Sequence, residues 1–257
     1  MFDYRGAVAV VSGASSGLGR RMAVDLAARG ATVVAVARRE HLLPEEAAER
    51  VAGDVADLDE WAALLASVER RHGRLDVLVN SAGIERRQGI ETLRWADVEE
   101  TLTVNYRAAA RATLAVVPGM LERGHGAVVN VSSDHGRAPG PGTPAYCASK
   151  AALGAFTESV AHEVRGRGVH LHVLYPGWVP TALGQGAVDA GMPKPPRLVR
   201  RTEEQVSRLA LDRIGGRSFE INAARLATLA PVVRALLPPV YRRSMQVTGG
   251  SSAPRRG

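Results

Sequence analysis

The sequence predicts a single α/β domain with a doubly wound parallel sheet and a helical C-terminal extension. Short apolar, β-branched runs alternate with longer amphipathic segments over most of the 257 residues. The segments between successive runs are long enough to cross over between parallel strands, which places helices on both faces of the sheet. No composition shift and no internal repeat divides the chain, so residues 1–248 are predicted to form one domain.

Apolar runs predict the strands, because strands buried on both faces have nearly continuous hydrophobic sequences. The runs lie at residues 7–12, 32–37, about 51–54, 75–80, 128–133, 170–174 and 218–222. Ser12, Asn80, Ser133 and Tyr175 stand at the carboxyl ends of four of these runs. Ligands of such sheets bind at that edge, so a binding site is expected there.

Helices are expected between these strands, where apolar residues recur with helical spacing. They are predicted up to about Arg29, at 58–71, at 95–121 with a bend at Asn105, from Pro144 onward and at 203–214. Residues 181–201 contain many Gly and Pro residues and are predicted to form a mobile loop with short helices. The last residues, 249–257, are predicted to be disordered.

The charge balance is basic, with 33 Lys and Arg against 26 Asp and Glu and a formal net charge of +7. A nucleic acid, an anionic membrane surface or merely a GC-rich genome that encodes Lys positions as Arg would each account for it. The arginines are scattered and no nucleic-acid motif is present, so no nucleic-acid partner is expected.

Cysteine and histidine usage excludes other classes of site. Cys147 is the only cysteine, so no internal disulfide is possible; a reducing compartment fits, and the thiol is expected to be a small buried helix residue. The histidines show no metal-ligand spacing, so no metal is expected. The chain begins without a charged leader or cleavage site and has no apolar stretch long enough for a membrane span. A cytoplasmic protein without a transmembrane segment is therefore expected.

A glycine cluster follows the first predicted strand and opens the first helix. Its spacing, Gly13-x3-Gly17-x-Gly19, is wider than the G-x-G-x-x-G fingerprint of dinucleotide-binding turns. Glycines let the backbone approach a pyrophosphate, and a helix N-terminus offers unpaired N–H groups to it. The alternative interpretation is a plain tight turn between a strand and a helix.

Three polar side chains are predicted to converge after the strand at 128–133. Tyr146 and Lys150 are four residues apart and therefore share one helix face. Ser133 ends the preceding strand and is expected to face the same point. A phenol, an ammonium and a hydroxyl are the groups that proton transfer between a carbonyl and an alcohol requires. The alternative is an ordinary aromatic–lysine pair on a helix surface.

In their order along the chain, these motifs resemble the short-chain dehydrogenase/reductase family over residues 7–181. Residues 12–19 stand where the family has its cofactor glycines, with Ser12 in place of the usual Thr. Asn80-Ser81-Ala82-Gly83 is similar to the family's NNAG segment and departs from it at Ser81. The positions of the family's catalytic tetrad hold Asn105, Ser133, Tyr146 and Lys150.

The resemblance implies a Rossmann-like fold and an oxidoreductase that interconverts a ketone or aldehyde and its alcohol with a nicotinamide cofactor. It implies that Tyr146 is the acid/base, that Ser133 holds the substrate oxygen, and that Lys150 also binds the nicotinamide ribose. Asn105 would anchor a water that links Lys150 to solvent. A free phenol titrates near 10, so the pKa of Tyr146 must fall by about 3 units, roughly 4 kcal/mol, under the influence of Lys150 and the positive nicotinamide ring.

The resemblance also implies a set of cofactor-binding residues along the carboxyl edge of the sheet. They are Gly13, Ser15, Ser16, Gly17, Leu18, Gly19, Arg38, Arg39, Asp54, Val55, Asn80, Ala82, Gly83, Tyr146, Lys150, Pro176, Gly177, Val179 and Thr181. In this set Asp54 would lie beside the adenine ring. Only 16 positions separate Arg38 from Asp54, so the helix between the second and third strands is expected to be cut back, exposing the adenine side of the site.

The end of the second strand favours NADP(H) over NAD(H). An enzyme that uses NAD needs a carboxylate there for the ribose 2′-hydroxyl, and the expected position is Ala37. Arg38 and Arg39 follow, and a guanidinium suits a 2′-phosphate. The alternative is that both arginines are solvated surface residues.

The substrate is expected to be a small carbonyl compound or alcohol, and the apolar segments around the site favour a lipophilic one. Asp134, His135 and Trp178 are candidates to line its pocket. Two other functions remain open: a catalytically silent NADP-binding sensor, and a different reaction such as a lyase on the same scaffold. The intact tetrad and glycines argue against both.

The apolar C-terminal segment, residues 223–246, has three interpretations. It packs over the substrate cleft, which is the default, or it forms a subunit contact, or it associates weakly with a membrane surface. The resemblance implies a homodimer or homotetramer, formed through the helices around 106–121 and 146–165.

Overall fold

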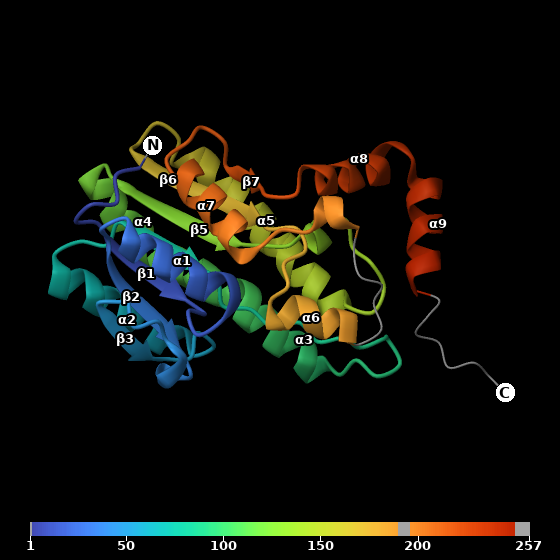
Figure 1. The fold of residues 1–257 in the computed structure, drawn as a ribbon, viewed down its shortest axis with the longest axis horizontal. Coiled ribbons are helices and arrows are strands. Elements are labelled where there is room, and N and C mark those ends of the chain that lie inside the picture. Colours follow the sequence, from blue (N-terminus) through green and yellow to red (C-terminus); the bar gives the residue numbers. More distant parts are fainter. Residues whose placement is uncertain (1, 190–195, 250–257) are drawn as a thin grey trace.

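The computed structural model describes residues 2–189 and 196–249 (Figure 1). The predicted disordered tail, 249–257, lies outside these ranges except for Gly249, which ends a helix. Within them the strands are β1 Val8–Ser12, β2 Thr32–Ala37, β3 Glu49–Ala52, β4 Val77–Asn80, β5 Gly126–Val131, β6 Val169–Tyr175 and β7 Glu220–Asn222. They form one sheet in the order β3-β2-β1-β4-β5-β6-β7, and each neighbouring pair is parallel. The predicted doubly wound parallel sheet is confirmed.

Burial explains which strands were predicted well. All residues of β1 and β4 are buried, as expected for strands covered on both faces. The third strand was predicted to reach Asp54, and this was wrong, because β3 runs from Glu49 to Ala52. It pairs only with β2 at the edge of the sheet, where charged residues such as Glu49 and Arg50 are tolerated, so a search for apolar runs places it too late.

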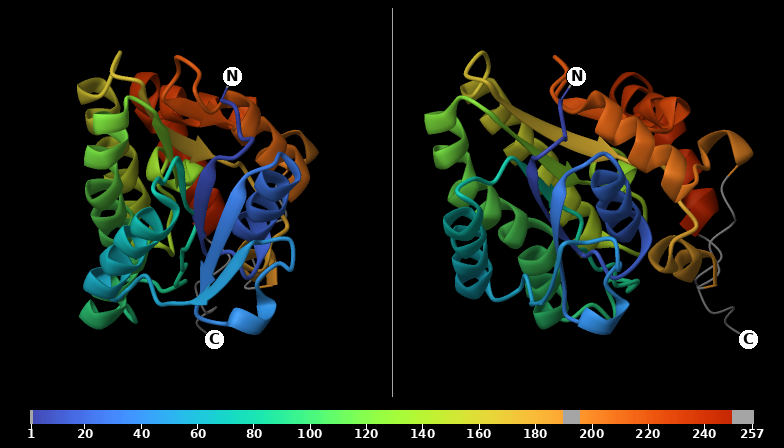
Figure 2. Two further views of the ribbon diagram at one scale, coloured as in Figure 1. Left: turned by 90° about the vertical axis from the view of Figure 1, so that its left-hand side faces the viewer. Right: turned by 60° about the vertical axis from the view of Figure 1, so that its left-hand side comes forward.

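Helices cover both faces of the sheet (Figure 2). They are α1 Gly17–Ala28, α2 Leu58–His72, α3 Trp95–Leu102, α4 Ala108–Arg123, α5 Pro144–Glu163, α6 Ala182–Asp189, α7 Glu203–Arg213, α8 Leu229–Leu236 and α9 Pro238–Gly249. One face is packed by α1 and α7, through side chains such as Met22 and Leu211. The other is packed by α2 and α4, through Leu65 and Val116.

Two irregular connections were predicted, and both are present. A short 3-10 turn, Glu40–Leu42, stands where a helix would otherwise join β2 to β3. The helix predicted at 95–121 is divided into α3 and α4 by a π-helical turn, Thr103–Arg107, which contains Asn105. Such turns interrupt the regular hydrogen-bond ladder of a helix and are frequent at functional sites.

The segments after β6 form short helices, which were part of the prediction for this region. Within the predicted loop 181–201 lie α6 and a 3-10 turn, Arg197–Val199, while residues 190–195 are outside the described ranges. The apolar segment 223–246 forms a 3-10 turn, Arg225–Thr228, and then α8 and α9, which extend from the body of the molecule (Figure 1). None of the residues of α8 is fully buried, and the interpretation that this segment packs over the substrate cleft stays a prediction.

His172 joins β6 to the segment between α7 and β7. It is 1% exposed, its Nε2 accepts a hydrogen bond from the Gly215 backbone N at 3.2 Å, and its Nδ1 lies 3.0 Å from the Ser218 carbonyl oxygen. This pair of contacts requires a neutral ring with its proton on Nδ1. Burial lowers the pKa of His172 from 6.5 to about 4.

We therefore expect the free energy of unfolding to fall as the pH decreases from about 6.5 to about 4. Over that window the unfolded chain binds a proton on His172 that the folded chain does not, at a cost of up to about 3 kcal/mol. Urea unfolding at several pH values measures it. The variant His172→Gln should lose most of this pH-dependent part, whereas His162→Gln, at an exposed position, should retain it. Equal pH dependence of the native protein and His172→Gln would contradict the assignment.

Candidate active site

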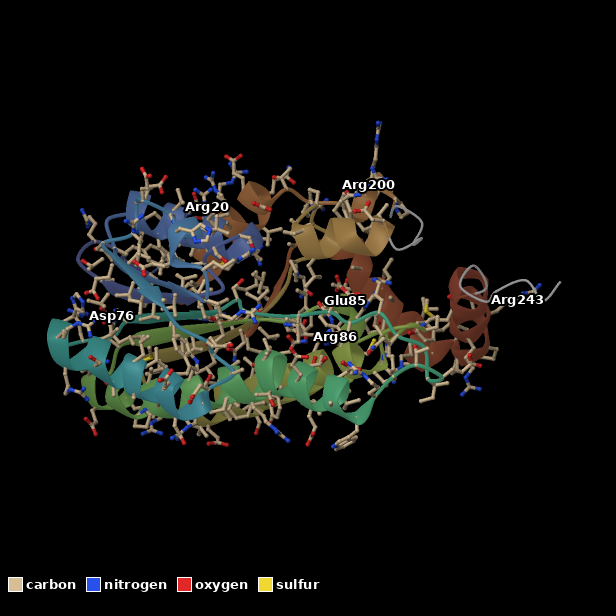
Figure 3. The ribbon with its side chains drawn as sticks, turned by 90° about the horizontal axis from the view of Figure 1, so that it is seen from below. Arg20, Asp76, Glu85, Arg86, Arg200 and Arg243 are labelled. Carbon is tan, nitrogen blue, oxygen red and sulfur yellow. The ribbon has the colours of Figure 1, made fainter. Side chains whose placement is uncertain are left out.

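The segments that leave β1, β4, β5 and β6 meet at the carboxyl edge of the sheet. Figure 3 shows the direction: Asp76, directly before β4, lies toward one end of the molecule, and Glu85 and Arg86, which follow β4, lie away from it. The residues predicted for the site come from these segments. The geometry of each turn decides how they lie.

The glycine turn and the turn after β4 are in direct contact. Gly13 has φ +68°, and a Cβ at this position would lie 2.7 Å from the backbone N of Ala82. The Ser12 hydroxyl accepts hydrogen bonds from the backbone N of Ser81 at 3.2 Å and of Ala82 at 3.3 Å. A hydroxyl at position 12 therefore holds the two turns together, and Ser supplies it as well as Thr would.

The N-terminus of α1 has the features of a diphosphate site. Ser16 caps the helix without a side-chain hydrogen bond to it, so its first N–H groups point outward beside Ser15 and Leu18. A Cβ on Gly19 would lie 2.5 Å from the Gly13 carbonyl oxygen, so this turn must be built from glycine. These residues fit the diphosphate of a dinucleotide.

The segment after β6 closes over the glycine turn. Gly17, with φ +55°, is in contact with Thr181, whose Cγ2 would lie 3.1 Å from a Cβ on this glycine. Gly177 has φ +71° and is packed against Ala224, while Val179 is buried. The segment after β6 therefore contacts α1 on one side and the residues after β7 on the other. It contains the predicted residues Pro176, Gly177, Val179 and Thr181.

Two adjoining cavities lie beyond the end of β2. A cavity of about 420 Å³ is lined by Arg38, Arg39, Glu40, His41 and Arg50. A second, of about 570 Å³, is lined by Ser15, Arg20, His41, Leu42, Leu43, Glu45 and Glu46. The missing helix between β2 and β3 leaves this side open, as the short connection predicted.

Two arginines of these cavities were missed by sequence reasoning. Arg50 belongs to the edge strand β3, where it pairs in register with Ala35. Arg20 projects from the first turn of α1 (Figure 3). The strand register would have identified Arg50, but only if β3 had been placed correctly.

Asp54 and Val55 follow β3 and have local roles. The Asp54 carboxylate accepts a hydrogen bond from the Ala56 backbone N at 3.0 Å, and Val55 is buried against α2 and the sheet. The contact of Asp54 with an adenine ring stays a prediction.

Lys150 is buried between α5 and β5. Its Nζ donates a hydrogen bond to the Val131 carbonyl oxygen at 2.8 Å and would lie 3.6 Å from a Cβ on Gly83. Burial lowers the pKa of Lys150 to about 8. The amine is thus fixed at the end of β5, between the turn after β4 and the helix that carries Tyr146.

Tyr146 and Ser133 are brought together, as predicted. The Ser133 side chain lies close enough to the Tyr146 phenol to act on its pKa, and Lys150 Nζ lies 5.8 Å from the phenol ring centroid. Burial raises the pKa of Tyr146 above its usual value, and the Ser133 hydroxyl opposes this rise. Lys150 alone therefore does not make the phenol acidic in this structure.

Asn105 fixes the turn after β4 from the π-helical turn. Its Oδ1 accepts a hydrogen bond from the Ile84 backbone N at 2.8 Å, and its Nδ2 donates to the Ile84 carbonyl at 2.9 Å and to Ser149 Oγ at 3.0 Å. The side chain is thereby used to position Gly83 and Ile84. The water relay that the resemblance implies stays a prediction.

The Asn80 side chain bonds a residue of the neighbouring strand β5. Its Nδ2 donates to Asn130 Oδ1 at 2.8 Å, and Asn130 in turn donates to Thr157 Oγ1 at 2.9 Å. This buried chain links β4, β5 and α5, so the Asn80 side chain holds the strands in place. Its neighbours Ala82 and Gly83 supply backbone to the site.

The three candidate substrate residues lie in different environments. His135 packs edge-on against Tyr146, with ring centroids 6.0 Å apart, and its buried Nδ1 has no hydrogen-bond partner among the described residues. Trp178 Nε1 is likewise buried without such a partner. Asp134 instead accepts a hydrogen bond from Arg137 at 3.0 Å, and Arg137 also bonds Glu220 of β7. Asp134 thus anchors its loop to the sheet.

Sequence reasoning missed Glu85 and Arg87. The Glu85 side chain is 8% exposed and forms an ion pair with Arg87 at 2.5 Å. Its charge contributes to the raised pKa of Tyr146 and acts on His135 as well. Their position directly after Asn80-Ser81-Ala82-Gly83 is the only sequence signal, and it is a weak one.

Comparison with known proteins places the chain in a family. A family model described as short chain dehydrogenase matches residues 7–190. A short chain dehydrogenase of Pseudocercospora fijiensis is 41% identical over 196 residues, which cover 71% of this chain and 62% of that relative. A fatty acyl-CoA reductase of Mycobacterium tuberculosis is 36% identical over 246 residues, which cover 84% of this chain and 83% of that relative.

Solved structures agree with the fold. A short chain dehydrogenase/reductase of Burkholderia phymatum in complex with NAD has a TM-score of 0.82 at 25% identity, covering 93% of this chain and 96% of that one. A short chain dehydrogenase of Burkholderia cenocepacia in complex with NADP has a TM-score of 0.80 at 23% identity, covering 95% and 99%. With its sheet, its glycine turn and a family match over most of its length, the chain belongs to the short chain dehydrogenase family.

Proposed function

We propose that this protein is an NADP(H)-dependent oxidoreductase that interconverts a ketone or aldehyde and the corresponding alcohol. The observation that carries the proposal is the approach of Ser133 and Tyr146 at the carboxyl edge of the sheet, with Lys150 on the next turn of the same helix. The glycine turn that fits a diphosphate opens toward the same edge. Acid/base groups and a cofactor cradle therefore stand beside one another.

The chemistry requires a proton donor and a group that holds the carbonyl oxygen. Bound NADPH would supply the hydride for the carbonyl carbon. Tyr146 would donate its proton to the oxygen as the charge develops there, and the Ser133 hydroxyl would hold that oxygen in line with the phenol. The raised pKa of Tyr146 keeps the phenol protonated, which is the state that reduction needs.

The reverse direction requires a phenolate, and the buried phenol resists ionisation. A positive charge near the oxygen favours the ionised form, so Lys150 and an oxidised nicotinamide ring would have to act together. Lys150, with a pKa of about 8, is still largely protonated at neutral pH. Its hydrogen bond to Val131 keeps the amine at a fixed distance from Tyr146.

Four basic side chains around the end of β2 support NADP(H) as the cofactor. Arg38, Arg39 and Arg50 line one cavity together with His41, against a single carboxylate, Glu40. Ala37, which ends β2, offers no acceptor for a ribose hydroxyl. A 2′-phosphate would find several guanidinium groups here, and guanidinium–phosphate pairs are strong and frequently bidentate.

A lipophilic substrate is the expectation for the other end of the site. A relative over most of the chain is named a fatty acyl-CoA reductase, which favours a substrate with an acyl chain. His135 and Trp178, whose buried nitrogens lack partners among the described residues, are the side chains that we propose to contact the polar part of the substrate.

Turnover of NADPH tests the activity directly. Purified protein that binds NADPH is assayed at 340 nm with a panel of aliphatic and aromatic aldehydes, ketones and acyl thioesters. Oxidation of NADPH with at least one carbonyl class supports the proposal. Cofactor binding without turnover across the whole panel would favour a silent sensor on the same fold.

For Tyr146→Phe we expect kcat to fall by about 10²- to 10⁴-fold, because the variant lacks the proton donor. The NADPH dissociation constant, measured by fluorescence, should change by no more than about twofold, since the phenol oxygen makes no large contribution to cofactor binding. Tyr106→Phe, on a ring that packs against Phe156, is the matched control and should keep its activity. Retained kcat in Tyr146→Phe would refute the assignment.

For Arg38→Asp we expect NADPH affinity to fall by about 10- to 100-fold, with a smaller effect on NADH, because a carboxylate repels the 2′-phosphate and accepts the ribose hydroxyl. Steady-state KM values for both cofactors measure the change. Arg70→Asp, at an exposed position of α2, controls for the loss of positive charge. An unaltered ratio of the two KM values would show that another residue determines the cofactor preference.

A further inference from the structure

The C-terminal arm, residues 225–249, exposes an unusual amount of aliphatic surface. Large apolar side chains along it are between 47% and 74% exposed, and they are Leu226, Leu229, Val232, Leu236, Leu237 and Val240. Monomeric proteins rarely expose such a contiguous set, and where they do the set marks an interaction site.

The exposed side chains lie on one side of α8. Leu229, Val232 and Leu236 are spaced by three and four residues, which places them in one stripe along the helix. No residue of α8 is buried against the body of the protein. The stripe therefore faces outward, available for contact.

The charge of the arm is entirely positive. Glu220 is the last acidic residue of the chain, and the sequence after it contains six arginines and no lysine. Arg242 and Arg243 of α9 are exposed, and Figure 3 shows Arg243 at the end of the molecule opposite to Asp76. The arm thus combines exposed aliphatic side chains with charge of one sign, and this combination complements a surface that is apolar inside and anionic outside.

The arm is hydrogen-bonded to the loop that precedes α5, the helix of Tyr146. The Tyr241 hydroxyl donates a hydrogen bond to the Pro139 carbonyl at 2.5 Å, and Arg234 donates to the Arg137 carbonyl at 2.9 Å. This loop joins the segment of Ser133 to α5. Figure 1 shows α8 and α9 beyond the end of the body at which α6 lies, so the arm stands beside the carboxyl edge of the sheet.

We propose that the C-terminal arm docks the protein on the surface of an anionic lipid membrane. Helices with an aliphatic face and an arginine-rich border lie in the interface of such membranes, with the apolar side chains below the headgroups. None of the helices in residues 2–189 and 196–249 is long and apolar enough to cross a membrane, so the arm lies on the surface and does not span it.

A second copy of the chain suits the arm less well. Pairing of two arms would bring their arginines together, and the arm offers no acidic side chain to neutralise them. An acidic protein partner is disfavoured because the exposed large apolar side chains of the arm are Leu and Val, and the one aromatic side chain of α8 and α9, Tyr241, already bonds the Pro139 carbonyl. A bilayer requires only aliphatic surface and positive charge.

Docking in this orientation would hold the active-site loop near the lipid. If the proposed function holds, a lipophilic carbonyl compound could pass from the bilayer to Tyr146 without crossing water. The docking itself does not rest on that function, and its test measures binding alone, so the two proposals fail separately.

Co-sedimentation of the full-length protein with vesicles tests the docking. Vesicles of phosphatidylcholine with about a quarter phosphatidylglycerol should bind the protein at least about tenfold more tightly than pure phosphatidylcholine. Raising NaCl from about 0.1 M to about 0.5 M should weaken the binding, because salt screens the arginines.

Two variants separate the apolar and the charged contributions. L229S/V232S/L236S and R242A/R243A should each weaken binding to the anionic vesicles by about tenfold or more. L114S, at a leucine that is 62% exposed on α4, and R165A/R167A, at two exposed arginines, are matched controls and should bind as the native protein does. Far-UV circular dichroism and the thermal unfolding midpoint verify that each variant is folded.

Absence of binding to the anionic vesicles would overturn the proposal, as would equal loss in the controls. Light scattering measures the oligomeric state and so tests whether a second copy of the chain binds the arm. If L229S/V232S/L236S converts an oligomer to a monomer and the native protein ignores vesicles, the arm belongs to a contact between copies of this chain.

Discussion

The hydrogen bond from Lys150 to the Val131 carbonyl is the interaction on which the site depends. A buried ammonium is costly unless it is paired, and here a strand end supplies the acceptor. The bond fixes α5 against β5, and this places Tyr146 opposite Ser133. Asn105 holds the neighbouring turn at Gly83 and Ile84 from the other side, so the amine has little room to move. Tyr146 is thus positioned by backbone contacts on both sides.

The residues around Tyr146 together raise the pKa of its phenol, and a bound oxidised cofactor would add a positive charge that lowers it. Burial and Glu85 favour the neutral phenol of Tyr146, while the Ser133 hydroxyl favours the phenolate. Lys150 Nζ lies 5.8 Å from the centroid of the Tyr146 ring. Burial lowers the pKa of this ammonium to about 8, so it loses its proton more readily than an exposed lysine does. A tyrosine held in this way remains protonated until a further positive charge arrives. The state of the cofactor would then determine which direction the proton moves.

The two ends of the carboxyl edge are built differently. At the end beside β2, the short connection between β2 and β3 leaves cavities lined by Arg20, Arg38 and Arg50 open to solvent. At the other end, the C-terminal arm is attached to the loop before α5 through Tyr241. Positive charge is present at both ends, and on the arm it accompanies a series of exposed Leu and Val side chains. A hydrophilic anion suits the first end, and a lipid surface the second.

The sequence by itself determined the features that depend on local pattern. Apolar runs predicted the central strands, glycine spacing predicted the turn at Gly13, and a four-residue interval put Tyr146 and Lys150 on one face. Only the tertiary structure decided which groups surround them. Glu85 and Arg50 reach the site through register and long-range packing, and the structure shows that the predicted residue Asn105 bonds the Ile84 backbone. The exposure of α8 was likewise visible only in the structure. Local spacing fixes the direction of a side chain, whereas burial, and therefore pKa and surface chemistry, is set by residues far away in the chain.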